Sequence, residues 1–308
     1  MELHATLKTR VLGCLLGGAL GDAWGGPYEG MTGPVVFEIP SRPALSDDTQ
    51  LTLATCQSII ELGRIHPENL ASHFLRWFLA GRVRGMGSST LKAMRDLAFG
   101  AHWALAGARG EFAAGNGAAM RIAPLAFLLN PTTSQDRTLI RDVCRITHHS
   151  DEAYVGALAI ILAIHSVLSG AWSQDRSFFA ITADSLPDSA VRDRIEELLP
   201  LRLPASEIAN RFGATGYVVD TVPLALYCAQ SIALEPLPTV LAQTISIGGD
   251  TDTIASIAGQ LAGTVLGSAG VPDNLVSEVD GGEELKSIAE DFAEFVSKRG
   301  SQSIQLDI

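Results

Sequence analysis

Two apolar segments rich in glycine and alanine constrain the fold of this chain more than any other feature of its sequence. They read GCLLGGALGDAWGG over residues 13–26 and IASIAGQLAGTVLG over residues 254–267. Their larger apolar residues recur at the spacing of a helix face. Glycine inside a helix costs about 1 kcal/mol relative to alanine, so this many glycines need a compensating gain. Close approach of one helix to another supplies that gain, and we expect both segments in a multi-helix bundle.

Helical spacing of apolar residues extends through most of the chain. Three apolar faces are formed by Leu12, Leu15, Leu16, Ala19 and Leu20, by Leu53, Cys56, Ile59 and Ile60, and by Leu70, Phe74, Trp77 and Phe78. Further helical patterns cover Ser89–Phe99, Ala118–Leu129, Thr138–Ile146, Ala153–Ser169, Ser189–Leu199, Asp220–Ser231, Leu237–Ser246, Thr253–Gly267 and Glu283–Lys298. The best alternating pattern, Val35–Ile39, predicts one strand, and no Asn-Gly or Asp-Gly turn joins two alternating runs. The sequence therefore predicts an all-α fold.

The length of 308 residues allows one large domain or two small ones. No internal repeat and no low-complexity linker divides the sequence. The turn-rich segments at residues 31–45, 100–117 and 200–206 are too short and too apolar to separate domains. We predict a single domain over residues 1–308, ending in a flexible tail at residues 299–308.

The composition excludes two classes of protein. With 47% hydrophobic and 18% charged residues, the chain does not belong to the disordered class, which combines low hydrophobicity with high net charge. The 34 Asp and Glu exceed the 22 Lys and Arg, for a formal net charge of -12. We expect no nucleic-acid partner, because neutralising phosphates requires a dense basic surface. An anionic ligand would have to be bound locally by a metal, backbone amides or a few arginines.

We expect a cytoplasmic protein without a membrane span. The N-terminus MELHATLKTR is polar and mixed in charge, unlike a signal peptide. The uncharged stretch Ala153–Gln174 is long enough to cross a bilayer, but His165, five Gly or Ser residues and an acidic flank favour a buried central helix. Four cysteines stand singly without a CxxC pair, as reduced core residues do: Cys14, Cys56, Cys144 and Cys228.

Two acidic clusters stand at the starts of predicted helices. Ser46–Gln50 reads SDDTQ, and Gly248–Thr253 reads GGDTDT. Helix capping explains the first cluster well, because a Ser or Asp at the N-cap binds free backbone amides and the helix dipole favours carboxylates there. Capping explains the second cluster less well, because it accounts for only one of two aspartates that follow a Gly-Gly turn.

Metal binding is the alternative to capping. Carboxylate, hydroxyl and water oxygens are the ligands that Mg²⁺ and Mn²⁺ prefer, and paired ions about 3.5–4 Å apart are common in hydrolases. Two such clusters, each in a nearly uncharged stretch, predict a dinuclear site. Ile254 argues against two other acidic motifs, since an EF-hand requires Asp or Asn there and the DxDx(T/V) phosphatase motif requires Thr or Val.

Six blocks of sequence, in order along the chain, point to a known family. They are GCLLGGALGDAWGGPYEG at 13–30, SDDT at 46–49, GNGAAMRIAPLA at 115–126, THHSDEAYVGALA at 147–159, GYVVDTVPLAL at 216–226 and SIGGDTDTIASIAGQLAG at 246–263. With these blocks the chain resembles the ADP-ribosylglycohydrolase family nearly end to end. The resemblance implies an orthogonal all-α bundle with a two-metal site in a central cleft.

The resemblance also implies the metal ligands and the cofactors. Two divalent cations, Mg²⁺ or Mn²⁺, are implied. The family more often has Thr where this chain has Ser46, and the hydroxyl oxygen is retained. Glu29 matches an acidic residue that lies over the cleft in the family, although by itself it is typical of an ordinary loop carboxylate. The implied ligands are Ser46, Asp47, Asp48, Asp250, Asp252 and Thr253.

Contacts with the organic ligand are implied for Gly115, Asn116, Gly117 and His148. Exposed amides at a glycine-rich turn suit a pyrophosphate, although a plain loop before a helix has the same pattern. Near His148, Asp151 is expected to cap the following helix. A second glycine-rich turn, at residues 85–90, is a weaker candidate. Three aromatic residues could stack on adenine, although core packing is their commoner role: Trp24, Tyr154 and Tyr217.

The function implied is metal-dependent hydrolysis of the glycosidic bond at C1″ of ADP-ribose. The reaction would release ADP-ribose from a modified protein side chain, with arginine expected first, or from a small molecule. Asp48 or Asp252 would take the proton of the attacking water, and Glu29 is the third candidate catalytic carboxylate. One alternative is a non-catalytic ADP-ribose-binding or structural protein that keeps the fold. The other is a hydrolase of another nucleoside diphosphate or N-glycoside.

Overall fold

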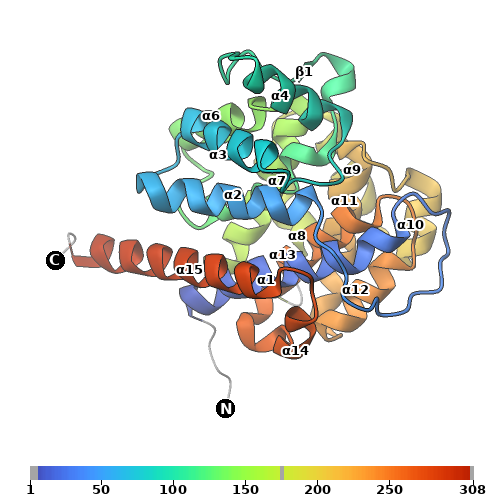
Figure 1. Cartoon of the computed structure of the whole chain (residues 1–308). Coiled ribbons are helices and arrows are strands. Elements are labelled where there is room, and N and C mark those ends of the chain that lie inside the picture. Colours follow the sequence, from blue (N-terminus) through green and yellow to red (C-terminus); the bar gives the residue numbers. More distant parts are fainter. Residues whose placement is uncertain (1–5, 174–176, 306–308) are drawn as a thin grey trace.

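The computed structural model describes residues 6–173 and 177–305, with the backbone alone at residues 111 and 300–305. The described residues confirm the all-α prediction (Figure 1). The helices are α1 Leu7–Gly25, α2 Asp47–Leu62, α3 Pro67–Leu79, α4 Ser88–Ala98, α5 Ala123–Ala126, α6 Ser134–Arg145, α7 Asp151–Leu168, α8 Phe178–Thr182, α9 Ala190–Leu198, α10 Ala205–Phe212, α11 Val218–Ala229, α12 Leu237–Ile245, α13 Thr251–Leu266, α14 Asp273–Ser277 and α15 Gly282–Gln305. Two short parallel strands, β1 Ala108–Arg109 and β2 His148–His149, pair in the described part of the chain.

The two glycine-rich segments form α1 and α13, which pack directly against each other. Gly13 and Gly17 of α1 face Gly263 and Gly259 of α13. A methyl group on any of these four glycines would lie within 3.0 Å of a backbone oxygen of the other helix. The glycines are therefore required by close backbone approach, as the sequence predicts. This contact also fixes Asp22, near the end of α1, beside the start of α13.

Helix α7 is the apolar segment that the sequence places in the core. It is the one helix of the described residues that is long and apolar enough to cross a membrane, and 78% of it is buried inside the fold. It packs against other helices, including α5, α6, α11 and α13. Such burial is typical of a core helix. The four cysteines are also buried and free, as expected.

Two sequence predictions of secondary structure are wrong. Residues Val35–Ile39 form no strand, because no second strand lies beside them; the amide of Val35 donates instead to the carbonyl of Ser246 (2.9 Å). The pattern Ala118–Leu129 becomes a helix only at Ala123–Ala126. Pro124 has no amide hydrogen and is tolerated only in the first turn, so the helix starts beside it rather than at residue 118.

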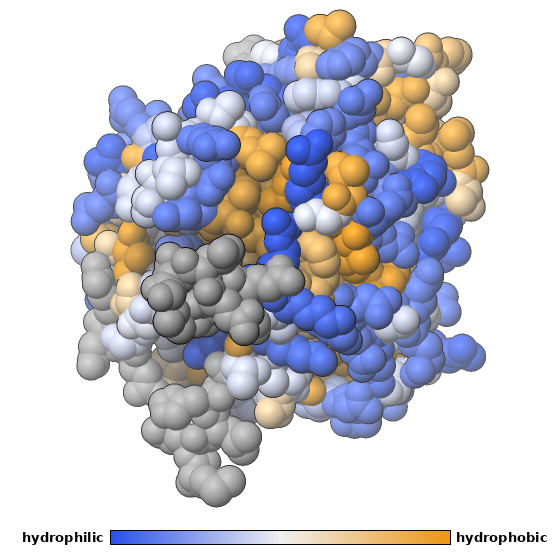
Figure 2. Space-filling view, turned by 90° about the vertical axis from the view of Figure 1, so that its left-hand side faces the viewer, coloured by the Kyte–Doolittle hydropathy of each residue, from blue (hydrophilic) through white to orange (hydrophobic). Residues whose placement is uncertain are grey.

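The C-terminal helix is longer than its apolar pattern predicts. Helix α15 continues past Lys298 to Gln305, through the segment in which we expected the tail to begin. Residues 306–308 lie outside the described residues. Figure 2 shows the face on the side of the C-terminus, where hydrophilic side chains cover much of the surface and hydrophobic side chains gather near the centre.

Candidate metal and ligand site

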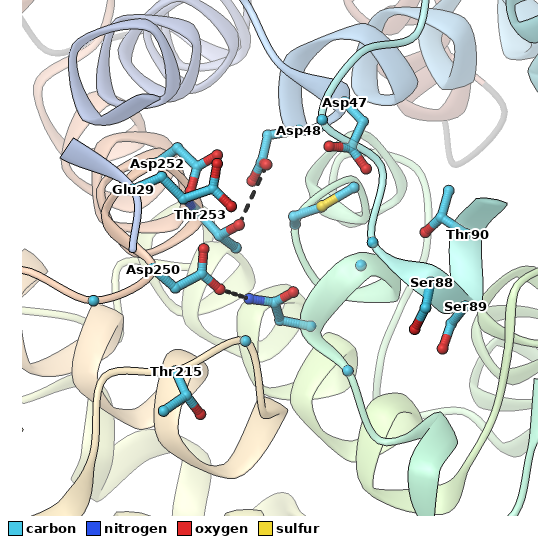
Figure 3. A pocket seen from close by; sticks show the side chains of 18 of the residues that line it. Glu29, Asp47, Asp48, Ser88, Ser89, Thr90, Thr215, Asp250, Asp252 and Thr253 are labelled. Atoms are coloured by element: carbon cyan, nitrogen blue, oxygen red, sulfur yellow. Dashed lines mark hydrogen bonds between the residues drawn. The ribbon is translucent and has the colours of Figure 1, made fainter. Parts of the chain in front are cut away.

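The ends of several helices surround a cleft of about 490 Å³ (Figure 3). Helix α2 contributes its first residues, and α13 contributes its first turn. The 3₁₀ helix after α1 is followed directly by Glu29, and the turn at residues 115–117 lies opposite. The cleft is lined by ten of the eleven predicted site residues: Glu29, Asp47, Asp48, Gly115, Asn116, Gly117, His148, Asp250, Asp252 and Thr253. Ser46, the remaining one, lies directly before Asp47.

Ser46 is the residue that caps α2. Its hydroxyl accepts a hydrogen bond from the amide of Asp48 (3.3 Å) and donates to Asp48 Oδ2 (3.1 Å). Asp22 of α1 accepts from two further amides of this helix start, those of Ser46 (3.1 Å) and Thr49 (3.2 Å). Three amides of the helix start, those of Ser46, Asp48 and Thr49, are therefore satisfied without Asp47, and capping of these amides does not explain its carboxylate.

The start of α13 is also not capped by its aspartate. Asp250 occupies the N-cap position but makes no side-chain hydrogen bond to the helix. Its Oδ2 instead accepts a hydrogen bond of 2.6 Å from the side chain of Asn116, which also donates to Thr221 (3.0 Å). Asn116 therefore orients Asp250 across the cleft. Capping is therefore confirmed for Ser46 in the first cluster, but it does not explain the carboxylate of Asp250 in the second.

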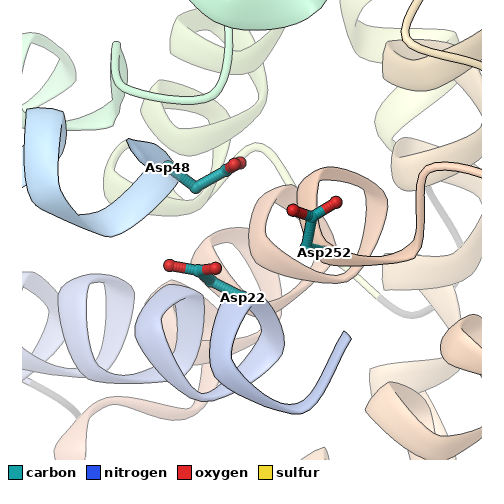
Figure 4. Close-up of side chains that lie close together, drawn as sticks. All are labelled: Asp22, Asp48 and Asp252. Carbon is teal, nitrogen blue, oxygen red and sulfur yellow. The ribbon is translucent and has the colours of Figure 1, made fainter. Parts of the chain in front are cut away.

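Two groups of carboxylates are close enough to share a cation. Asp22, Asp48 and Asp252 each offer an oxygen within 4.8 Å of the others, and all three are buried (Figure 4). Glu29, Asp250 and Asp252 form a second group with the same limit, nearer to solvent. Asp252 belongs to both groups and so joins them. Asp22 is the member that the sequence analysis missed, although it is the one charged residue of its apolar segment.

Burial and mutual repulsion dominate the electrostatics of this cluster. Burial raises the pKa of Asp48 well above its ordinary value, and the charge of Asp252 raises it further. Burial and then Asp250 raise the pKa of Asp252 to about 9, and burial and then Asp22 raise that of Asp47 to about 7. Burial, followed by Asp250, raises the pKa of Glu29. Like charges in a low dielectric produce this pattern, and a cation would reverse it.

The donor set fits a hard divalent cation. It consists of carboxylate and hydroxyl oxygens, with Thr253 Oγ1 donating to Asp48 Oδ2 (3.3 Å). Asp48 Oδ1 is buried and has no hydrogen-bond partner among the described residues. A buried carboxylate oxygen without a donor is unfavourable unless a cation or water satisfies it. The acidic cluster can therefore bind metal.

His148 faces the glycine turn from the other side. A Cβ atom on Gly117 would lie 2.9 Å from the imidazole carbon Cε1, so only glycine fits there. Burial, together with the charge of Arg121, lowers the pKa of His148 to about 3, and the ring is neutral at pH 7. Its Nδ1 lies 2.7 Å from the hydroxyl of Thr147.

Arg121 is a buried cation that the sequence analysis did not single out. It donates to the carbonyl of Gly117 and to Thr147 Oγ1 (2.8 Å), and its guanidinium lies over the ring of Phe74 at 5.0 Å. Burial lowers its pKa to about 10, so it stays charged. Since the Thr147 hydroxyl accepts from Arg121, its own hydrogen is left for Nδ1 of His148. This pattern favours the tautomer that carries its hydrogen on Nε2, toward the turn.

The aromatic residues are distributed differently from the sequence expectation. Trp24 and Tyr154 are buried in the core, and Tyr217 is partly exposed but does not line the cleft. Phe112 was missed; it lines the cleft and is 89% exposed. The second glycine-rich turn does line the cleft, at Gly85 and at residues 87–90.

The expected cap of α7 is also corrected. Ser150, not Asp151, occupies the N-cap position, and its hydroxyl accepts from the amide of Ala153 (3.4 Å). Asp151 stands in the first turn of the helix. Either residue type serves as an N-cap, and the one directly before the helix takes that role.

In this all-α bundle, carboxylates from three helix ends meet in one cleft. An acidic cleft that can bind metal is typical of metal-dependent hydrolases, which is the class of protein that the fold and site indicate. Comparison with known sequences narrows the class. The family model described as ADP-ribosylglycohydrolase matches residues 3–302, and the chain belongs to this family. The family and the enzyme class expected from the six sequence blocks are confirmed, and the chain is a glycohydrolase.

Three curated relatives are similar over most of their length. The ADP-ribosylhydrolase ARH3 of Danio rerio is 27% identical, over 92% of this chain and 90% of that protein. The ADP-ribosylarginine hydrolase Tri1 of Pseudomonas putida is 26% identical, over 92% and 77%. The ADP-ribosyl-[dinitrogen reductase] glycohydrolase of Rhodospirillum rubrum is 26% identical, over 89% and 92%. The solved structure of an ADP-ribosylglycohydrolase-related protein complex has the same fold, with a TM-score of 0.74 at 24% identity, over 94% of this chain and 99% of that chain.

Proposed function

We propose that this protein hydrolyses the glycosidic bond at C1″ of ADP-ribose and releases it from a modified arginine side chain, using two Mg²⁺ or Mn²⁺ ions. Membership of the ADP-ribosylglycohydrolase family supports the removal of ADP-ribose. The proposal of two ions rests on Asp252, because this residue belongs to both carboxylate groups of the cleft. A carboxylate between two sites is the usual bridge of a dinuclear centre.

We assign the ligands from the two groups. Asp48, Asp252 and Thr253 would hold the inner cation with Ser46 and Asp47, while Asp250 and Asp252 would hold the outer one, with Glu29 beside them. Asp22 is placed to support the inner group, because its oxygens already accept the amides of Ser46 and Thr49. When bound, the cations supply Lewis-acid polarisation of the ribose hydroxyls and lower the pKa of water.

The carboxylates of the protein would move the protons. Asp48 and Asp252 are both buried and line the cleft, and either is placed to take the proton of the attacking water. Glu29 lies at the solvent side of the cleft, with a pKa raised by burial and by Asp250, and is placed to deliver a proton to the leaving group. Two carboxylates on opposite sides of the bond are the usual arrangement in glycoside hydrolysis.

The opposite wall would bind the rest of the ligand. The amides of the two glycines in the turn at Gly115–Gly117 and the Nε2 hydrogen of neutral His148 suit the pyrophosphate, while the amide of Asn116 donates to the carbonyl of Gly216 (3.0 Å). Phe112 is placed to stack on adenine, because its exposed ring lies at the edge of the cleft. Asn116 would act mainly through Asp250, which its amide already holds at 2.6 Å.

The charge at the cleft opening supports arginine as the leaving group. Glu29 and Asp250 lie on the solvent side, and a guanidinium is attracted to carboxylates there. The buried, free cysteines support a reducing, cytoplasmic location.

A release assay tests the proposal. ADP-ribosylated arginine, serine and acetate are each incubated with metal-stripped protein, with and without Mg²⁺ or Mn²⁺, while ADP-ribose binding is measured by calorimetry. We expect metal-dependent release from arginine, and loss of release in Glu29→Gln with ADP-ribose binding retained. Binding without release from any substrate would instead support the non-catalytic ADP-ribose-binding alternative.

A further inference from the structure

Large apolar side chains are exposed on the segment that leads into the cleft. Phe99 is 93% exposed and Leu105 is 64% exposed, and the same segment ends at Phe112, which lines the cleft. Exposed apolar residues gathered next to a functional site mark an interaction surface more often than scattered ones do. This segment follows α4 directly and contains β1; α4 and β1 lie together at one end of the molecule in Figure 1.

The segment is held in place by hydrogen bonds. The amide of Ala101 donates to the carbonyl of Asp96 (3.0 Å), and the amide of Gly107 donates to Asp96 Oδ2 (3.1 Å). The amide of Ala108 donates to the carbonyl of Thr147 (3.1 Å), within the β1–β2 pair. The exposed apolar side chains are therefore presented by an ordered backbone, which lowers the entropy cost of binding.

Basic side chains surround these apolar residues. Residues 81–112 contain five Lys and Arg against two Asp and Glu, the reverse of the chain as a whole. Arg95, Arg109 and Arg145 are exposed, and no carboxylate of the described residues forms an ion pair with them. Arg109 lies opposite His149 in the β1–β2 pair, α4 with Lys92 and Arg95 packs against β1, and α6, which ends at Arg145, packs against β2.

We infer that this surface, consisting of Lys92, Arg95, Phe99, Leu105, Arg109 and Arg145 and called the rim surface below, binds an acidic and apolar segment of the modified protein beside its ADP-ribosylated residue. The inference rests on the proposed function, because it takes the cleft to hold the ADP-ribose. Charge selects the partner. Lys92 is paired with Asp96 (2.6 Å), but the three arginines of the surface have no such ion pair among the described residues, and they repel a basic segment and attract an acidic one. Phe112 connects the rim surface to the cleft, so a protein substrate would contact both at once.

Two peptides and one small compound test the inference. Each peptide carries one ADP-ribosylated arginine, flanked in one by Glu and Phe and in the other by Lys and Ser; the compound is ADP-ribosylated arginine alone. We expect a kcat/KM for the acidic peptide about tenfold above that for the basic one, falling as salt is added. In the double variant Arg95→Glu, Arg109→Glu the preference should reverse, with release from the small compound within about twofold of the parent.

A charge-matched control has Arg64→Glu and Arg202→Glu, two exposed arginines that do not line the cleft. This control should keep the preference for the acidic peptide. Equal use of both peptides by the parent, or an unchanged preference in the double variant, would contradict substrate binding by the rim surface.

If the parent releases nothing from the small compound, the proposed function fails instead. Fluorescence anisotropy with the labelled, unmodified acidic peptide then tests peptide binding by the rim surface separately. Weaker binding by the double variant than by the parent supports the inference, and equal binding contradicts it.

Discussion

At the scale of single residues, Asp252 carries the most weight, because it belongs to both carboxylate groups. We predict that Asp252→Asn lowers hydrolysis by about a hundredfold or more and weakens metal binding, since a neutral amide replaces a shared anionic ligand. Metal-free Asp252→Asn should be no less stable than the metal-free parent, because one of several repelling carboxylates is removed. Release assays, metal calorimetry and thermal unfolding measure the three quantities.

Asp193→Asn is the matched control, because Asp193 also stands in the first turn of a helix but is exposed and outside the cleft. It should change neither hydrolysis nor metal affinity. An Asp252→Asn protein with normal hydrolysis and normal metal affinity would leave a local structural role as the better account of Asp252.

Thr147 tests how the buried cation Arg121 acts on His148. Thr147→Val removes the hydroxyl that joins the two side chains, so we predict about tenfold weaker ADP-ribose binding. The change also leaves a guanidinium donor of Arg121 unpaired in the core, which should cost about 1–3 kcal/mol of unfolding free energy. Thr147→Ser keeps the hydroxyl and should restore binding. Binding is measured by calorimetry, and NMR of the imidazole nitrogens follows the tautomer of His148; a tautomer that is the same in the valine variant would contradict this role.

At the scale of elements, the contact between α1 and α13 positions the acidic groups. We predict that Gly259→Ala lowers the free energy of unfolding by about 1–3 kcal/mol, because its methyl group would collide with the backbone of Gly17. Helix propensity alone predicts the opposite sign, a gain of about 1 kcal/mol. Gly26→Ala is the control, because nothing lies within 4 Å of its added methyl group. Denaturant unfolding measures both; a stabilised Gly259→Ala protein would show that the two backbones can separate.

The elements also show what the sequence can and cannot predict. The helix starts after Ser46 and Asp250 were predictable, because apolar spacing is local and, at Ser46, so is cap chemistry. The sequence of Val35–Ile39 does not by itself exclude a strand. A strand also needs a partner strand, and whether one lies beside these residues depends on the fold. Asp22 and Arg121 were missed because each stands alone in its segment; their roles come from residues distant in sequence that the fold brings beside them. The bond from Asn116 to Asp250 is of the same long-range kind.

At the scale of the whole molecule, the acidic cluster links stability to pH and to cations. The pKa of Asp47 is raised to about 7 and that of Asp252 to about 9, so in metal-free protein the folded state holds protons that the unfolded state releases above about pH 4. Raised pKa values mean that stability is greatest at low pH and falls as pH rises through these values. We therefore predict that Mg²⁺ raises the Tm more at about pH 8 than at about pH 5. Thermal unfolding with and without Mg²⁺ checks this, with Ca²⁺-free buffers throughout; an equal shift at both pH values would contradict it.

The central claim is that the cleft uses divalent cations to release ADP-ribose. The most direct measurement is release from ADP-ribosylated arginine by protein stripped with EDTA and then supplemented with Mg²⁺ or Mn²⁺, followed by chromatography of free ADP-ribose. The account predicts no release after stripping and full recovery with either ion in the parent, but not in Asp252→Asn. Undiminished release by the thoroughly stripped protein would contradict it.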